Sequence, residues 1–83
     1  MKHSVLDRVA SISARVAALN RRKADLEEEI AAEELRPAPD GLRLRQLKAR
    51  KLRIRDQLAR YDGVLRTLKP LAGHAAARRG GLA

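Results

Sequence analysis

Apolar residues in the first half of the chain recur at alternating steps of four and three residues. This alternation places the side chains along one stripe of an α-helix, as in the seam of a coiled coil. Ser4 and Asp7 form a capping-box-like start, with Ser4 as the N-cap. The pattern predicts a helix over about residues 4–35, after a frayed start at residues 1–3. The seam positions are Val5, Val9, Ile12, Val16, Leu19, Lys23, Leu26 and Ile30.

The same alternation returns after a short breaker at residues 36–40, which holds two prolines and is followed by a glycine. Proline and glycine end a helix, and Asp40 is a suitable N-cap for the next one. A second helix is predicted over about residues 41–69, with a break at Gly63 left open. Residues 70–83 have no sustained apolar period and are predicted to form a flexible basic tail. The second seam consists of Leu44, Leu47, Lys51, Ile54, Leu58, Tyr61, Leu65 and Leu68.

The connection between the two helices is so short that they must pack as antiparallel neighbours. When the two seams are paired in antiparallel register, the two residue numbers in every layer add to 77. The pivot then falls between Ala38 and Pro39, in the middle of the breaker. The sequence thus predicts an all-α fold, an antiparallel two-helix hairpin that resembles a coiled coil and is about 45 Å long.

The predicted core is thin, because the 83 residues include a single aromatic side chain, Tyr61, and no cysteine. Small single cores of this kind usually need a staple, a metal or a second subunit. Leu42 and Leu52 lie off the seam, where nothing in a monomer covers them. We therefore expect self-association, most simply a homodimer that forms a four-helix bundle, with Leu42 and Leu52 among its contacts.

The formal net charge of +9 is unevenly distributed. Residues 21–35 hold three basic and six acidic groups, whereas residues 36–69 hold eleven basic and three acidic groups. In the hairpin these two stretches lie opposite each other, so part of the charge is neutralised within the molecule. The expected ion pairs are Glu29 with Arg50, and both Glu27 and Glu34 with Lys48.

The basic groups that remain after such pairing favour a polyanion as a partner. Contacts between arginine and phosphate would be independent of base sequence and strongly weakened by salt. The single tyrosine lies in the seam, so the surface has no stacking platform for single strands. The candidate polyanion contacts are Arg43, Arg45, Arg50, Arg53, Arg60, Arg66, Arg78 and Arg79.

Lys23 and Lys51 occupy core slots in adjacent layers and are predicted to form a polar core layer. One interpretation is that they extend past the seam toward Glu27 and its neighbours. Another is that a polar layer fixes the register or the oligomeric state at some cost in stability. A catalytic or anion-binding lysine pair is disfavoured, because no general base lies near by in the sequence.

The sequence contains no pattern typical of an enzyme. His3 and His74 have no second ligand at helical spacing, and no Gly-rich phosphate loop precedes a helix. No catalytic, cofactor or metal site is therefore predicted. No apolar run approaches the roughly 20 residues of a membrane span, and the start lacks the apolar segment of a secretory signal. We expect a non-enzymatic, cytoplasmic protein without a membrane span.

Two segments, LEEEI (Leu26–Ile30) and LKARKLRIRDQL (Leu47–Leu58), resemble the YdcH-like family of small bacterial coiled-coil proteins, a domain of unknown function. The family pattern begins with a polar residue, which is often His. A Leu follows three residues later, and an Ile follows four residues after the Leu. A run like L-K-x-x-K-L-x-[IL]-[KR]-D-[EQ]-[ILM] comes after a short break. The matching positions are Leu26, Ile30, Leu47, Lys48, Lys51, Leu52, Ile54, Arg55, Asp56, Gln57 and Leu58.

The resemblance covers about residues 19–60 and departs from the family in two ways. Lys23 stands where the family often has His, and the extension beyond Tyr61 is longer than usual. The resemblance implies a helical hairpin with an accessory, non-enzymatic role.

Two functions follow as hypotheses. The first is an interaction or scaffold protein that self-associates and binds an unidentified protein partner through the hairpin surface. The alternative is a nucleoid- or RNA-associated protein that binds the phosphate backbone non-specifically through the second helix and the basic tail.

Overall fold

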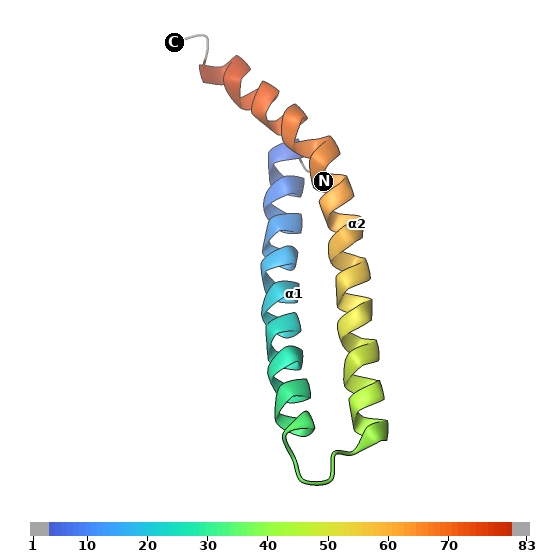
Figure 1. Cartoon of the computed structure of the whole chain (residues 1–83). Coiled ribbons are helices and arrows are strands. Elements are labelled where there is room, and N and C mark those ends of the chain that lie inside the picture. The colour runs from blue at the N-terminus through green and yellow to red at the C-terminus, as the bar shows by residue number, and fades with distance from the viewer. Residues whose placement is uncertain (1–3, 81–83) are drawn as a thin grey trace.

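The chain folds into two long antiparallel helices joined by a short connection (Figure 1). The computed structural model describes residues 4–80, with side-chain positions through residue 71. Helix α1 spans Val5–Glu34 and helix α2 spans Gly41–Gly80. The two helices pack against each other, and no strand occurs within the described residues. The predicted all-α hairpin is confirmed, whereas the predicted frayed start at residues 1–3 lies outside the described part of the chain.

Both helices begin as their caps predict. The hydroxyl oxygen of Ser4 accepts a hydrogen bond from the backbone N–H of Asp7 at 3.1 Å, and the N–H of Ser4 donates to the Asp7 carboxylate at 3.4 Å. This reciprocal pair satisfies two N–H groups that have no partner inside α1. At the start of α2, the side chain of Asp40 accepts from the N–H of Arg43 at 3.1 Å. At the other end of α1, Leu35 is the C-cap.

The core is a single file of side chains between the helices. The buried cluster consists of Leu26, Ile30, Leu47 and Ile54, with Leu19, Leu44 and Leu58 packed against it. All seven belong to the predicted seams. Leu47 is the most buried of the apolar side chains at 4% exposure, and no described side chain is less than 2% exposed. The hairpin therefore has a seam but no enclosed interior.

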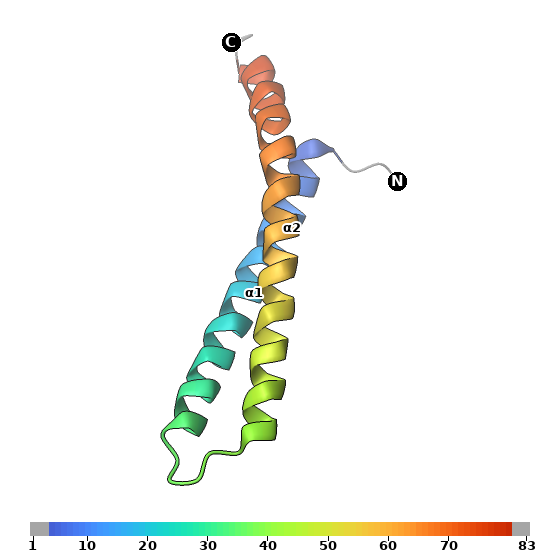
Figure 2. The same ribbon diagram turned by 45° about the vertical axis from the view of Figure 1, so that its right-hand side comes forward.

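The register of the two helices agrees with the predicted pairing. Arg15 on α1 donates a hydrogen bond to the hydroxyl of Tyr61 on α2 at 3.0 Å. Glu27 on α1 lies 3.2 Å from the ammonium group of Lys51. In each pair the sum of the residue numbers differs by one from 77, as expected for side chains that flank the seam. Figure 2 shows that the helices cross at a shallow angle, which suits packing of side-chain ridges into grooves.

The predicted end of the second helix near Lys69 is wrong. Helix α2 continues through Pro70 to Gly80, so the segment predicted as a flexible basic tail is helical over residues 70–80. A proline removes one backbone hydrogen bond and crowds the carbonyl four residues earlier, which kinks a helix without having to end it. The residues that follow are mostly Ala, Leu and Arg, which favour helix.

Figure 1 shows α2 changing direction in its orange part and projecting past the start of α1. This projection makes the molecule 65 Å long, against about 45 Å for the 30 residues of α1 alone.

Gly63 lies inside α2 without interrupting it, and it provides a test of the continuous helix. A Cβ atom built at Gly63 meets nothing within 4 Å. Gly63→Ala should therefore stabilise the protein by about 1 kcal/mol, because alanine loses less backbone entropy in a helix. Urea unfolding followed by circular dichroism at 222 nm measures the change.

The matched control is Ala59→Gly, one turn earlier on the exposed surface of the same helix. It should destabilise by a similar amount, about 1 kcal/mol. A loss of stability in Gly63→Ala would mean that the helix is not continuous at this point.

Candidate interaction surfaces

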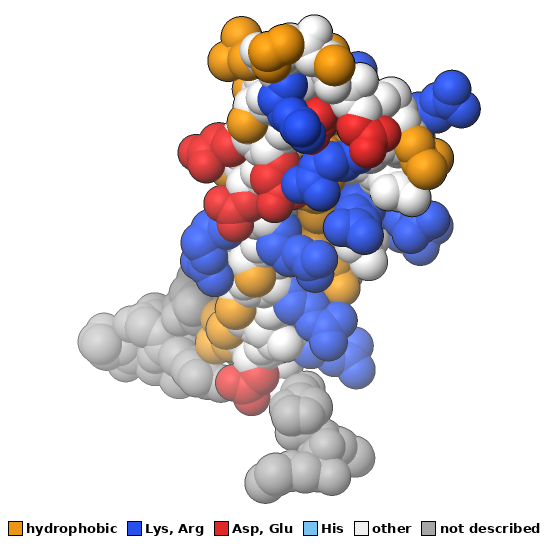
Figure 3. All heavy atoms as spheres, turned by 90° about the horizontal axis from the view of Figure 1, so that it is seen from below, with side chains coloured by type: hydrophobic (Ala, Val, Ile, Leu, Met, Phe, Trp, Pro, Cys, Tyr) orange, Lys and Arg blue, Asp and Glu red, His pale blue; other side chains and the backbone are white. Residues whose placement is uncertain are grey.

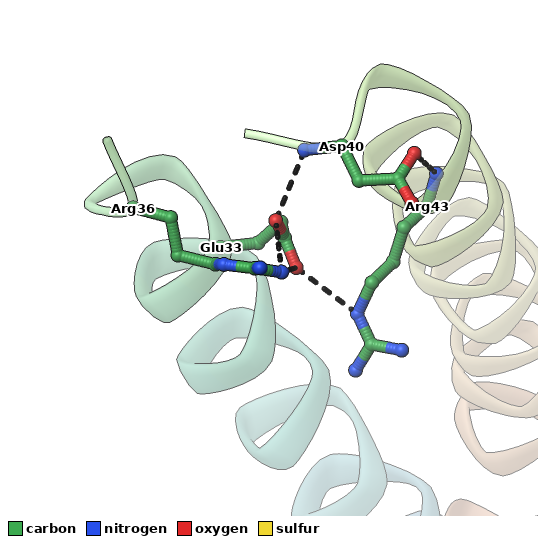
Figure 4. A network of polar contacts seen from close by, with 4 residues as sticks. All are labelled: Glu33, Arg36, Asp40 and Arg43. Carbon is green, nitrogen blue, oxygen red and sulfur yellow. Dashed lines mark hydrogen bonds and ion pairs between the residues drawn. The ribbon is translucent and has the colours of Figure 1, made fainter. Parts of the chain in front are cut away.

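The most buried charged group in the described part of the chain is the carboxylate of Glu33, in the last turn of α1. Its side chain is 4% exposed. Figure 4 shows its partners: the guanidinium of Arg36 at 3.1 and 3.2 Å, the backbone N–H of Asp40 at 3.0 Å, and Nε of Arg43 at 3.2 Å. One carboxylate thus joins the end of α1, the connection and the first turn of α2.

The surroundings of Glu33 lower the pKa of its carboxyl group below the ordinary value of 4.5. The main cause is the hydrogen bond from the backbone N–H of Asp40, followed by the hydrogen bond and the positive charge of Arg36 and the charge of Arg43. Burial acts in the opposite direction, since it penalises the charged form. The donors prevail, so Glu33 is held as a carboxylate.

Sequence reasoning missed Glu33, although a signal was present. Glu33 is the next step of the first seam, three residues after Ile30, and its antiparallel partner under the rule of 77 is Leu44. A carboxylate in a seam position next to a turn, with arginines on both sides of that turn, indicates a buried ion pair. The seam therefore ends in a polar layer rather than at Ile30.

The two seam lysines behave differently. Both are half-buried, and Lys51 extends past the seam to Glu27. Lys23 has no carboxylate within 4.0 Å in the part of the chain that the structure describes. The role of this polar layer in fixing register or oligomeric state stays a prediction.

The predicted ion pairs between the acidic and basic stretches form in part. Lys48 lies 3.6 Å from Glu34, as expected. Glu27 pairs with Lys51 instead of Lys48, and among the described residues Glu29 has no ion pair with Arg50. Arg50 therefore keeps a positive charge that no carboxylate neutralises at close range.

A groove runs along one side of the seam, between α1 and α2, and four arginines line it. We call it the arginine groove. It consists of two adjoining hollows of about 270 and 280 Å³ that share Leu19, Arg22 and Gln57. The lining residues of the two hollows are Arg15, Ala18, Leu19, Arg22, Arg50, Arg53, Ile54, Gln57 and Tyr61.

Charges in and around the arginine groove are of one sign over most of its length. Of the four groove arginines, only Arg15 has a side-chain partner in the described structure, the hydroxyl of Tyr61. This hydrogen bond raises the pKa of Arg15. Toward the turn, a third hollow also contains Arg22 and Arg50 but is lined by the carboxylates of Asp25 and Glu29 as well. Viewed from the turn, Lys and Arg side chains gather mainly on one side of the hairpin (Figure 3).

The structure divides the predicted polyanion contacts into groups. Arg43 is bound to Glu33 and Arg66 to Asp62 at 2.9 Å. Among the described residues, four others have exposed side chains with no carboxylate within 4.0 Å. These four are Arg45, Arg50, Arg53 and Arg60. The side chains of Arg78 and Arg79 lie outside the described residues.

Arg15 and Arg22 of α1 line the groove but were missed by sequence reasoning, which considered only the second helix and the tail. Their signal is the seven-residue spacing of Arg8, Arg15 and Arg22, which places them in one row beside the seam.

A hollow with one exposed leucine lies on the other side of the seam. Leu52 is 57% exposed and lines a hollow of about 470 Å³ with Ile30 from α1. The remaining lining residues are Glu34, Lys48, Lys51 and Arg55. Leu42, in the first turn of α2, is 65% exposed. Both leucines predicted as oligomer contacts are thus uncovered in the single chain.

These features define a small antiparallel two-helix protein whose surfaces lie on the flanks of one seam. The model of the family described as "Protein of unknown function (DUF465)" matches residues 15–62, more than half of the chain. The protein therefore belongs to this family, the YdcH-like small proteins, as the two sequence segments indicated. No curated protein and no solved structure matches the chain. Within residues 4–80, no helix combines the length and the apolar composition that crossing a bilayer requires.

The Glu33 carboxylate should make the stability of the hairpin depend on pH. Its pKa is lowered in the folded state, so its contribution is present above the unfolded value and is lost as the pH falls through the folded value. Glu33→Gln should lower the melting temperature at neutral pH. The difference from the parent protein should shrink as the pH falls below 4.5. Thermal melts followed by circular dichroism at several pH values measure this difference.

Glu28→Gln is the matched control, since Glu28 is an exposed glutamate of the same helix that makes no ion pair in the described structure. It should change the melting temperature little at any pH. A deficit of Glu33→Gln that stays constant from neutral to acidic pH would contradict the role assigned to the charge.

Proposed function

We propose that this protein is a non-enzymatic interaction module that works as a self-associated hairpin, with a second copy of the chain covering the face around Leu52. The observation that supports the proposal most directly is the mismatch between a shallow seam and exposed apolar side chains. Leu42 and Leu52 stay more than half exposed, while five apolar side chains are buried among the described residues. Chains of this size commonly gain the missing burial from a partner subunit.

The charges on the Leu52 face suit a pairing of identical copies. Its acidic lining residue, Glu34, belongs to α1, whereas Lys48 and Arg55 belong to α2. In a two-fold symmetric dimer each surface meets itself in reverse. The acidic helix of one copy can then lie against the basic helix of the other while the leucines pack at the centre.

A module of this kind needs neither a catalytic group nor a cofactor. The match to a family of unknown function is compatible with such a role and indicates no enzymatic family. A scaffold acts through surfaces held at fixed positions on a rigid element, and the length of the hairpin suits this purpose.

Self-association is tested by size-exclusion chromatography with light scattering over a range of micromolar concentrations. The parent protein should have the mass of a dimer. The double variant Leu42→Gln/Leu52→Gln should raise the dimer dissociation constant about 100-fold or more. This follows because burying one leucine contributes about 1.5–3 kcal/mol and each 1.4 kcal/mol is about tenfold.

Leu71→Gln is the control, because Leu71 is an exposed leucine of α2 beyond Pro70, at the opposite end of the hairpin from the connection, and it does not line the hollow around Leu52. It should leave the mass unchanged. A parent protein that stays monomeric at every concentration would refute the proposal, as would a double variant that dimerises as tightly as the control.

A further inference from the structure

The arginine groove brings several basic groups without close counter-charges together around one hollow. Elsewhere, Arg43, Lys48 and Arg66 each have a carboxylate of the same chain within 4.0 Å. Arg22, Arg50 and Arg53 have none among the described residues, although they surround a single hollow of about 280 Å³. Three positive groups placed around one hollow repel each other, so the arrangement favours an external anion.

We propose that the arginine groove binds the phosphate backbone of a nucleic acid strand. The guanidinium group offers planar, paired N–H donors that match the oxygens of a phosphate, and it stays charged at any physiological pH. Gln57 lines both hollows of the groove and can donate a further hydrogen bond. This activity goes beyond self-association and uses a different surface.

The length of the groove suits a strand with repeated phosphates. Arg15 and Arg22 are seven residues apart on α1, which is about 10.5 Å along the helix axis. A duplex strand has one phosphate for about every 3.4 Å of its axis, so more than one phosphate comes within reach of these arginines. Both hollows are open grooves on the surface, where a single small anion would keep most of its water.

The chemistry of the groove favours contacts with the backbone over contacts with bases. Tyr61 is the only aromatic residue of the chain, and its hydroxyl is bound to Arg15. The apolar residues that line the groove, such as Leu19 and Ile54, are half-buried or buried in the seam. Little apolar surface of the groove therefore remains to enter a membrane. Binding should therefore be independent of sequence and steeply dependent on salt.

The change in the sign of the charge along this side of the hairpin limits where the strand lies. Asp25 and Glu29 line the third hollow, on the turn side of the groove, and their charges disfavour phosphate there. The binding segment is thus the part between Arg50 and Arg15, on the side of the molecule away from the turn. None of its lining residues belongs to the hollow around Leu52, so binding and self-association are separable.

The test uses the full chain and a fluorescein-labelled duplex DNA of about 20 base pairs, titrated by fluorescence anisotropy over about 50–300 mM salt. The groove variant is Arg22→Gln/Arg50→Gln. The control is Arg21→Gln/Lys69→Gln, which lowers the net charge by the same amount as the groove variant. Like the groove variant it alters one exposed residue on each helix, but both of its residues lie outside the groove. Helicity by circular dichroism and mass by light scattering should be the same for both variants.

The groove variant should bind about tenfold more weakly at about 100 mM salt, and the slope of log K against log salt should fall by about 2, one unit for each lost phosphate contact. The control should keep the slope of the parent protein. Equal weakening in both variants would show that net charge alone is responsible and would overturn the proposal. The proposal would also be overturned if the parent protein did not bind DNA at about 50 mM salt. It would be overturned as well if pyrophosphate released the protein from DNA more strongly than chloride does at equal ionic strength, because the groove would then bind a small anion in preference to a strand.

Discussion

The buried carboxylate of Glu33 determines how α2 leaves the connection. It binds the side chain of Arg36 and the backbone N–H of Asp40 in the connection, and the side chain of Arg43 in the first turn of α2. With these three points fixed, the first turn of α2 has one position relative to α1, and the two seams meet in one register. A slip of the register would remove Asp40 and Arg43 from Glu33 and leave its buried charge with Arg36 alone, which is costly.

Because the seam is shallow, most of the surface of the hairpin lies on its flanks. Two helices in contact bury one stripe each, so most of every helix faces outward. One flank combines exposed leucine with charges of both signs, and the other is lined by arginine without counter-charges. The first is suited to another copy of the chain and the second to phosphate, so one small fold can present two different surfaces.

Most of the hairpin could be predicted from sequence, because the alternation of four and three residues and the prolines leave one solution. The seam, the capping residues and the register follow from local patterns. The end of α2 could not be predicted, because a proline that kinks a helix and a proline that ends it have the same local signature. The arginine groove was missed because polyanion contacts were sought only on the second helix and the tail, so Arg15 and Arg22 of α1 were not placed beside Arg50. Glu33 was missed because the seam was followed only through apolar residues.

The last turn of α1 holds Glu33 and Glu34 and no basic residue. Carboxylates at this end oppose the helix macrodipole, whose negative pole lies at the C-terminus, so α1 alone is disfavoured by its own charges. In the hairpin the positive pole of α2 lies beside the same carboxylates, and Lys48 and Arg43 come with it. The charges that weaken the isolated helix therefore stabilise the pair, which couples the formation of α1 to its docking on α2.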